Sequence, residues 1–254
     1  MQNWLKAPIP TEVNPTVHRA RRGIPGEFGA RLGWLWLTVA LAMVGCSPES
    51  PPPPPAPTPI VDLVALQKRA EAGEASAQAQ LGKCLAEGHG TATDYPLAVK
   101  WYKAAVAQGN AEAKAGLGEL YEAGQGVPKD LAEAARLYRE AADQGSVAGQ
   151  YNLAILYEQG RHFRTDQVAA SKWYRLAAEG GDPIAEYDLG QRYDLGIGVP
   201  ADRVEALFWL EVAKANGQTD SIARAKLVES KLSRAEITTA RERAKAFKPR
   251  PASQ

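Results

Sequence analysis

The chain has 254 residues, of which 45% are hydrophobic and 23% are charged, enough apolar material for one or two globular domains. Alanine is abundant while methionine and phenylalanine are scarce, which favours closely packed helices over a strand-rich core. The formal net charge of +1 is unevenly distributed, because residues 46–220 are acidic and residues 221–254 are basic. An acidic body lacks the concentrated basic face that a nucleic-acid backbone requires, so we expect no nucleic-acid partner.

Residues 1–45 are predicted to be a lipoprotein-type signal peptide. Arginines precede an apolar stretch, Leu32 to Gly45, that has the length of a signal-peptide core and falls short of the roughly 20 residues needed to span a bilayer. The stretch ends in "MVGC", which resembles the lipobox of bacterial lipoproteins and implies that Cys46 is lipidated. An ordinary cleaved signal and a short membrane anchor are the alternatives. By the sorting pattern of such lipoproteins, Ser47 implies the outer membrane, with the body on its periplasmic face.

Residues 46–59 are predicted to be a proline-rich linker. The segment "SPESPPPPPAPTP" cannot form a helix or a sheet ladder, so we expect an extended polyproline spacer. At about 3.1 Å per residue it would hold the folded body roughly 40 Å from the lipid. A PxxP ligand for another domain is the alternative interpretation.

Beyond residue 60 the sequence repeats with a period of 36 residues. Leucine recurs at one position of the period, glycine and alanine at two each, and aspartate at one. The six columns are Leu81, Leu117, Leu153 and Leu189; Gly88, Gly124, Gly160 and Gly196; Asp94, Asp130, Asp166 and Asp202; Ala98, Ala134, Ala170 and Ala206; Ala105, Ala141, Ala177 and Ala213; Gly109, Gly145, Gly181 and Gly217. A fixed period of this length is typical of a stacked array.

Each unit is predicted to be a helix–turn–helix. In the second unit Asn110 is a candidate N-cap for the first helix, and Gly124 is expected to end that helix in a left-handed conformation. Asp130 is expected to cap the second helix and to form a capping box with Glu133, a pattern that Asp202 and Glu205 repeat. The intervening "GQGVPKD" is therefore interpreted as a turn, since a phosphate loop would need a preceding strand.

The quoted units "LGELYEAGQGVPKDLAEAARLYREAADQG" and "LGQRYDLGIGVPADRVEALFWLEVAKANG" resemble the Sel1-like repeat, a relative of the tetratricopeptide repeat. The resemblance implies an all-α fold, a right-handed α-solenoid used for protein–protein contact. The repeat domain is expected to cover residues 60–248. Its parts are a half-repeat N-terminal cap (60–75), four repeats (76–111, 112–147, 148–183 and 184–220) and a C-terminal capping helix pair (221–248) that opens its last helix with a Ser233/Glu236 capping box.

Catalytic and metal-binding patterns are weak in this sequence. His89 and His162 fall in inter-helix loops without a second ligand at metal spacing, so we expect no metal and no cofactor. Cys84 stands where later repeats have leucine and is interpreted as a buried hydrophobic residue. An S-x-x-K signature is absent at every serine, so the chain is predicted not to be an enzyme.

Two candidate binding surfaces remain. Relatives with this architecture use the first helix of each repeat on the concave side, where tyrosines stand beside an acidic column that suits a basic or extended peptide. These candidates are Tyr151, Tyr187, Ile155, Gln191, Glu122, Glu158 and Asp194. The alternative is that the tyrosines pack against neighbouring helices and the carboxylates are merely solvated. The second surface is the third repeat's loop "GRHFRTD", which gains Arg161, His162, Phe163 and Arg164; sequence drift is its alternative.

We therefore expect a lipid-anchored scaffold of the bacterial cell envelope whose partner is another envelope protein or peptide. A peptidoglycan- or polysaccharide-binding protein and a β-lactamase-like hydrolase are the alternative functions.

Overall fold

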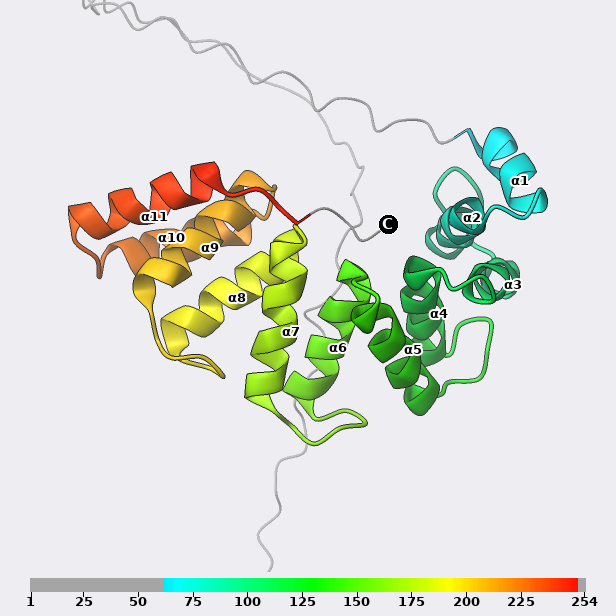
Figure 1. The fold of residues 1–254 in the computed structure, drawn as a ribbon, viewed down its shortest axis with the longest axis horizontal. Coiled ribbons are helices and arrows are strands. Elements are labelled where there is room, and N and C mark those ends of the chain that lie inside the picture. Colours follow the sequence, from blue (N-terminus) through cyan, green and yellow to red (C-terminus); the bar gives the residue numbers. More distant parts are fainter. Residues whose placement is uncertain (1–61, 251–254) are drawn as a thin grey trace, which may run out of the picture. The chain divides into compact units, whose positions relative to one another are not determined.

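The computed structural model describes residues 62–250, and within that range every regular element is an α-helix (Figure 1). The predicted all-α fold is therefore confirmed. The predicted signal peptide, Cys46 and the proline-rich linker lie outside the described residues. None of the helices in the described range is long and apolar enough to cross a membrane.

Eight helices form four consecutive hairpins, each made of a first helix (helix A) and a second helix (helix B). The A helices are α2 (Ala75–Glu87), α4 (Ala111–Ala123), α6 (Val147–Gln159) and α8 (Pro183–Leu195). The B helices are α3 (Tyr95–Val106), α5 (Leu131–Asp143), α7 (Gln167–Glu179) and α9 (Arg203–Ala215). The flanking helices are α1 (Leu63–Glu71), α10 (Asp220–Glu229) and α11 (Arg234–Ala246).

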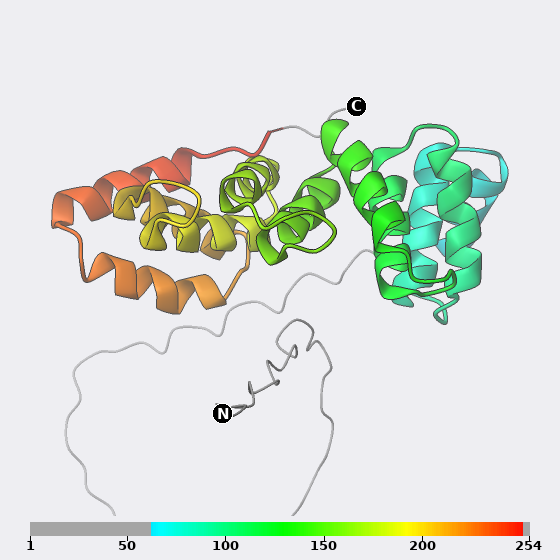
Figure 2. The same cartoon turned by 90° about the horizontal axis from the view of Figure 1, so that it is seen from below.

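The hairpins stack so that α3, α5 and α7 each pack both on their own helix A and on helix A of the next repeat (Figure 2). Neighbouring A helices also touch: α2 contacts α4, and α4 contacts α6. At one end α1 packs on α2. At the other end α10 and α11 both pack on α9, so they shield the last repeat from water.

Helix ends follow the period because the same capping residues recur. Asn110, Ser146 and Asp182 cap the A helices of repeats 2 to 4, each accepting a hydrogen bond from a first-turn amide. The aspartates that recur every 36 residues cap all four B helices in the same way. The glycine that follows each A helix lies in the left-handed region, with φ of 72°, 72°, 67° and 70° in chain order. A side chain costs roughly 1–2 kcal/mol in that conformation, which explains the glycine column.

The capping boxes predicted for the B helices are wrong in their reciprocal half. Asp130 accepts from the Glu133 amide, but the Glu133 carboxylate pairs with Arg136 instead of reaching back to the cap. In repeat 4 the Glu205 carboxylate pairs with Arg243 of α11. In both cases a guanidinium within reach offers a charged partner that competes with a neutral backbone amide. The Ser233/Glu236 box of α11 is confirmed in both directions.

The core is built from the apolar columns of the period. The four column leucines are at most 6% exposed, and all eight column alanines are fully buried. Small side chains are required where helices approach closely. At Gly149 of α6, for example, an added Cβ would lie only 2.6 Å from the Cβ of Ala141 in α5, so a side chain larger than alanine at position 141 would not fit. Cys84 is a free thiol that is buried, as its shared repeat position with Leu120 and Leu156 predicts, and burial raises its pKa.

Candidate interaction surface

The predicted aromatic column lies on the A helices of repeats 3 and 4. Tyr151 and Tyr187 occupy the same repeat position on α6 and α8, and Ile155 follows Tyr151 by one helical turn. All three side chains are half-buried and pack against the hydrophobic core. Together with the half-buried Gln191 they define what we call the A face. Part of each side chain is fixed by the core and part is open to a partner.

The predicted acidic column is paired within the chain. Glu122 accepts hydrogen bonds from the Tyr138 hydroxyl (2.8 Å) and from Arg161 (2.5 Å) of the next repeat. One repeat later, Glu158 accepts from the Tyr174 hydroxyl (2.8 Å) and from Arg192. These carboxylates therefore join neighbouring repeats.

Asp194, the last member of the column, is the most enclosed. Its side chain is 2% exposed and accepts a hydrogen bond from Arg224 of α10 at 2.7 Å. Lys231 lies 3.7 Å and Arg203 4.0 Å from the other carboxylate oxygen. Three cations surround one carboxylate, so Asp194 anchors the C-terminal cap to repeat 4.

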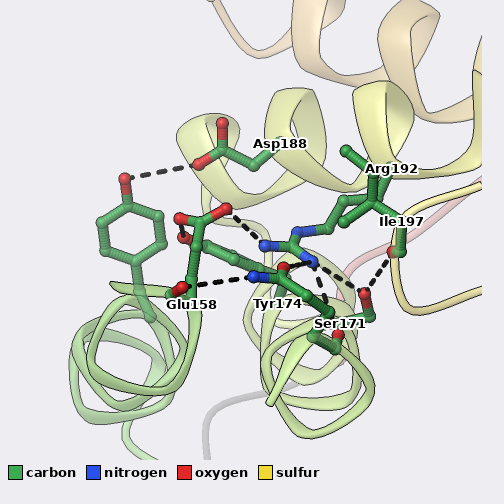
Figure 3. Close-up of polar contacts among 8 residues, drawn as sticks. Glu158, Ser171, Tyr174, Asp188, Arg192 and Ile197 are labelled. Carbon is green, nitrogen blue, oxygen red and sulfur yellow. Dashed lines mark hydrogen bonds and ion pairs between the residues drawn. The ribbon is translucent and has the colours of Figure 1, made fainter. Parts of the chain in front are cut away.

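A buried polar cluster at the junction of α6, α7 and α8 surrounds Arg192 (Figure 3). The guanidinium donates to Glu158, to the Ser171 hydroxyl at 3.0 Å and to the Gln167 side-chain oxygen at 3.1 Å. It also lies over the Tyr174 ring, 4.7 Å from the centroid. Ser171 in turn donates to the backbone oxygen of Ile197 at 2.8 Å, which ties the repeat-4 loop to helix α7.

Asp188 extends this cluster toward the A face. Its carboxylate accepts a hydrogen bond from the Tyr151 hydroxyl at 3.4 Å, and the two side chains come from different repeats (Figure 3). Burial, with a further contribution from the nearby Glu158 charge, raises the pKa of Asp188 to about 7. The Tyr151 ring also meets the Tyr174 ring edge-on, with centroids 5.7 Å apart. Tyr151 is thus both a candidate contact residue and part of the inter-repeat packing.

Arg192, Ser171, Tyr174 and Asp188 were not predicted as site residues. A signal for Arg192 was present in the period, because Cys84, Leu120 and Leu156 occupy the same position in the other repeats. A charge in an otherwise apolar column predicts a buried ion pair, since an isolated buried charge is strongly unfavourable.

Another carboxyl group enclosed in the repeat stack belongs to Glu186 in α8. It is fully buried, and its two oxygens accept hydrogen bonds of 2.8 and 3.0 Å from the Asn216 amide. Burial raises the pKa of Glu186 to about 7. The same repeat position holds Gln78, Lys114 and Gln150, which are also buried and polar. Each repeat therefore carries one buried polar side chain near the start of helix A.

The predicted loop site of repeat 3 divides into two kinds of residue. Arg161 pairs with Glu122, and the Phe163 ring stacks on Tyr157 with centroids 4.7 Å apart. His162 and Arg164 are exposed. Among the described residues, His162 is the one residue other than glycine with a positive φ, 67°. The other three repeats have glycine at the same position.

Within residues 62–250 no group of three or more His, Cys, Asp or Glu side chains is arranged to hold a metal ion. The polar groups described above are held by one another, in hydrogen bonds and ion pairs between repeats. Their arrangement suits mechanical coupling of repeats and the presentation of a fixed surface.

Taken together, stacked helical hairpins with a common period define an α-solenoid. A family model for the Sel1 repeat matches residues 75–110, 111–146, 147–182 and 183–218, so the chain belongs to the Sel1 repeat family. The matched units begin one residue before the units expected from the period. Proteins with Sel1 repeats generally mediate protein–protein interactions.

Solved structures with the same repeat are similar to this chain. A Sel1 repeat protein from Oxalobacter formigenes is 28% identical with a TM-score of 0.59, over 72% of this chain and 77% of its own. A protective antigen of uropathogenic Escherichia coli with an SLR fold is 28% identical with a TM-score of 0.49, over 72% of this chain and 47% of its own. A Sel1 repeat protein from Klebsiella pneumoniae is 27% identical with a TM-score of 0.44, over 65% and 82%. No curated protein matches the sequence.

Proposed function

We propose that this chain is a non-catalytic scaffold that holds a partner protein or peptide on the A face of repeats 3 and 4. We further propose that lipid on Cys46 tethers it to the bacterial cell envelope, with the outer membrane as the site and the periplasm as the compartment. The family supports the scaffold role, and the sequence of residues 1–59 supports the tether.

The observation that carries the scaffold role is the half-buried trio of Tyr151, Ile155 and Tyr187. Side chains already fixed by the core lose little conformational entropy when a partner covers them, and tyrosine supplies much contact area for that small loss. The neighbouring carboxylates of Glu122 and Glu158 are paired within the chain. We therefore favour a partner that offers apolar and aromatic contacts over one recognised by its positive charge alone.

The experiment is site-specific photo-crosslinking in the native envelope. A photoreactive phenylalanine analogue replaces Tyr187 in one strain and Val168, a 68% exposed residue of helix α7, in a control strain. We expect a defined protein adduct from position 187 and none from position 168. The same adduct from both positions, or none from either, would contradict an A-face partner.

A matched pair of variants tests the same surface without a crosslinker. Combining Ile155→Ala with Tyr187→Ala is expected to reduce capture of the crosslinked partner at least tenfold and to leave the helical content unchanged. Tyr151 is left in place because it also supports Asp188. The control, Val168→Ala, is expected to capture the partner normally. Binding of purified cell-wall sacculi instead of a protein would favour the peptidoglycan-binding alternative, and turnover of a β-lactam the hydrolase.

The tether is tested by Cys46→Ser. We expect the wild-type chain to incorporate a labelled fatty acid and to sediment with outer membranes, and the variant to lose both properties. A wild-type chain that carries no label would contradict lipidation at Cys46.

A further inference from the structure

An open cleft of about 490 Å³ lies among α7, the end of α8, the loop that follows it, α9 and α11. The cleft is lined by two arginines, Arg175 and Arg243, and by the aromatic residues Tyr193, Phe208 and Trp209. None of the A-face residues lines it. The volume is within the range of small-ligand sites, which are roughly 300–1,000 Å³.

The two arginines differ in how their charges are used. Arg243 pairs with Glu205 at 2.6 Å and lies over the Phe208 ring, 4.6 Å from its centroid. Arg175 lies over the Tyr193 ring at 5.5 Å and donates to the Tyr193 hydroxyl, but no ion pair found within residues 62–250 includes it. Arg175 is therefore a pre-positioned guanidinium with capacity for an anion at the cleft.

The adjacent carboxylates of the cleft are already engaged. Asp202 accepts hydrogen bonds from the amides of Val204 and Glu205, at 2.9 and 3.0 Å, as the N-cap of α9. Glu205 is held by Arg243. Both carboxylates keep their charges but already have partners. Arg175 is the cationic side chain of the lining that forms no ion pair within the described residues, so an entering carboxylate can pair with it.

The preceding repeat contains the same arrangement with a ring in place. Shifted by 36 residues, Arg175 and Tyr193 become Arg139 and Tyr157. There Phe163 of the chain's own loop stacks on Tyr157 at an interplanar angle of 15°. Arg139 lies 5.6 Å from the centroids of both rings. Repeat 3 thus shows that an aromatic ring fits against a tyrosine and a guanidinium held in this way.

In repeat 4 the residue equivalent to Phe163 is Val199, a smaller side chain without a ring. The tyrosine and the arginine are retained, and they line an open cleft instead of holding an internal phenylalanine. A ring supplied from outside can stack on Tyr193 as Phe163 does on Tyr157. Offset-stacked rings gain about 0.5–1.5 kcal/mol beyond the area they bury.

We infer that this cleft binds the C-terminal aromatic residue of a partner protein. The ring stacks on Tyr193, and the terminal carboxylate pairs with Arg175. A C-terminal residue brings an aromatic ring and a carboxylate within one residue of each other, which matches the spacing of one tyrosine and one guanidinium in hydrogen-bond contact. The inference rests on the proposed scaffold role and adds a second contact surface to it.

The test uses the purified full-length chain and three small probes in ligand-observed saturation-transfer NMR. N-acetyl-phenylalanine carries ring and carboxylate, its amide lacks the carboxylate, and N-acetyl-alanine lacks the ring. We expect the first probe to bind at millimolar concentration. We expect the other two to bind about tenfold more weakly, the loss that corresponds to one charge-assisted hydrogen bond or one ring contact.

Two variants locate the site. Val199→Phe places a ring where repeat 3 has one and is expected to abolish binding of N-acetyl-phenylalanine. Arg175→Gln keeps a hydrogen-bond donor and is expected to remove the difference between the acid and its amide. Lys172→Gln, an exposed change on the same helix that does not line the cleft, is the matched control and is expected to bind like the wild type.

Equal binding of acid and amide by the wild type, undiminished binding by both variants, or no saturation transfer at 20 mM probe (about the weakest contact of interest) would each overturn the inference. Crosslinking from position 187 does not depend on this cleft. A failed probe experiment therefore leaves the A-face proposal standing, and a failed crosslinking experiment leaves the cleft standing.

Discussion

The guanidinium of Arg192 donates a hydrogen bond to the carboxylate of Glu158 across the boundary between repeats 3 and 4. The two partners are unequally enclosed, because the arginine side chain is 4% exposed and the glutamate side chain 40%. Loss of the glutamate therefore strands a buried charge, whereas loss of the arginine leaves a carboxylate that water can reach. Loss of the glutamate should therefore destabilise the chain more than loss of the arginine.

Glu158→Gln is expected to lower the free energy of unfolding by about 3 kcal/mol, since it removes the charge that compensates a buried guanidinium. It keeps an oxygen that can accept from the Tyr174 hydroxyl. Arg192→Leu restores the residue of repeats 2 and 3 and is expected to cost about 1 kcal/mol, the scale of an exposed pair. In the double variant most of the loss should be recovered. Urea denaturation measures all three variants.

Glu122→Gln is the matched control, because Glu122 occupies the same repeat position as Glu158 and pairs with Arg161, with side chains 26% and 34% exposed. Both side chains of this pair are half-buried and reach water, so loss of Glu122 strands no buried charge. A pair that water reaches contributes about 0–1 kcal/mol, so this variant should lie close to the wild type. Strictly additive losses from Glu158→Gln and Arg192→Leu would show that the two side chains are not coupled.

His162→Gly is expected to raise the free energy of unfolding by about 1 kcal/mol. The residue has a φ of 67°, a conformation that costs a side chain roughly 1–2 kcal/mol, and its edge contact with Phe163 offsets part of that cost. The change should appear as a higher denaturation midpoint. The other loop histidine, His89, lies outside the left-handed region, so His89→Gly should be neutral or slightly destabilising. A destabilised His162→Gly would mean that the ring contact outweighs the backbone strain.

The fold could be predicted from the sequence because each rule that shapes a repeat acts within one unit. Leucine and alanine columns, N-caps and the left-handed glycines all recur every 36 residues, so the four repeats indicate the same helix boundaries and the same core positions. The reciprocal half of the Glu205 box failed because its competing partner, Arg243, is 38 residues away and outside the period. The reciprocal half of the Glu133 box failed because Arg136, one helical turn further along, pairs with the carboxylate.

The polar contacts of the A face could be predicted only in part. The period locates Glu122, Glu158 and Asp194 as one column. Their arginine partners lie 39, 34 and 30 residues further along the chain, at three different places in the repeat. The period therefore predicts the carboxylate acceptors but not their arginine donors, because long arginine side chains can reach the same carboxylate position from different places in the repeat.

Two carboxyl groups, that of the fully buried Glu186 and that of the half-buried Asp188, are expected to make stability fall as the pH rises. Their pKa values in the folded chain are raised to about 7 from ordinary values of 4.5 and 3.8. Asp182 lies near both and raises both pKa values further, while Asn216 and Tyr151 donate hydrogen bonds that lower them. Between about pH 4 and 7 the native state binds more protons than the unfolded chain, so the stabilising contribution is complete below pH 4 and lost through pH 7.

The chain supplies its own isosteric replacements for these groups. Glu186→Gln reproduces Gln150 of repeat 3, and Asp188→Asn reproduces Asn152. The double variant is expected to be more stable than the wild type at pH 8 and to lose the fall in stability, which amounts to at most about 1.4 kcal/mol per pH unit for each group. Urea midpoints at pH 4, 6 and 8 test this. Glu112→Gln, an exposed change on α4, is the control and should leave the wild-type pH profile intact. A double variant with the wild-type profile would show that protonation of Glu186 and Asp188 is not coupled to stability.

Gly198→Ala is expected to be the most destabilising single change in the loops, at about 3 kcal/mol or more. A Cβ at this position would lie 1.9 Å from the backbone oxygen of Gln167 and 2.6 Å from the Ser171 hydroxyl, and the residue has a φ of 66°. The loop would have to lift from helix α7, which breaks the hydrogen bond from Ser171 to Ile197 and disturbs the contacts of Arg192. Gly196→Ala is the matched control. Gly196 has the same left-handed conformation as Gly198, but a Cβ added at Gly196 would meet no atom closer than 3.4 Å. It should cost only about 1–2 kcal/mol, the backbone term alone. Equal losses in the two variants would show that the loop does not depend on its close contact with helix α7.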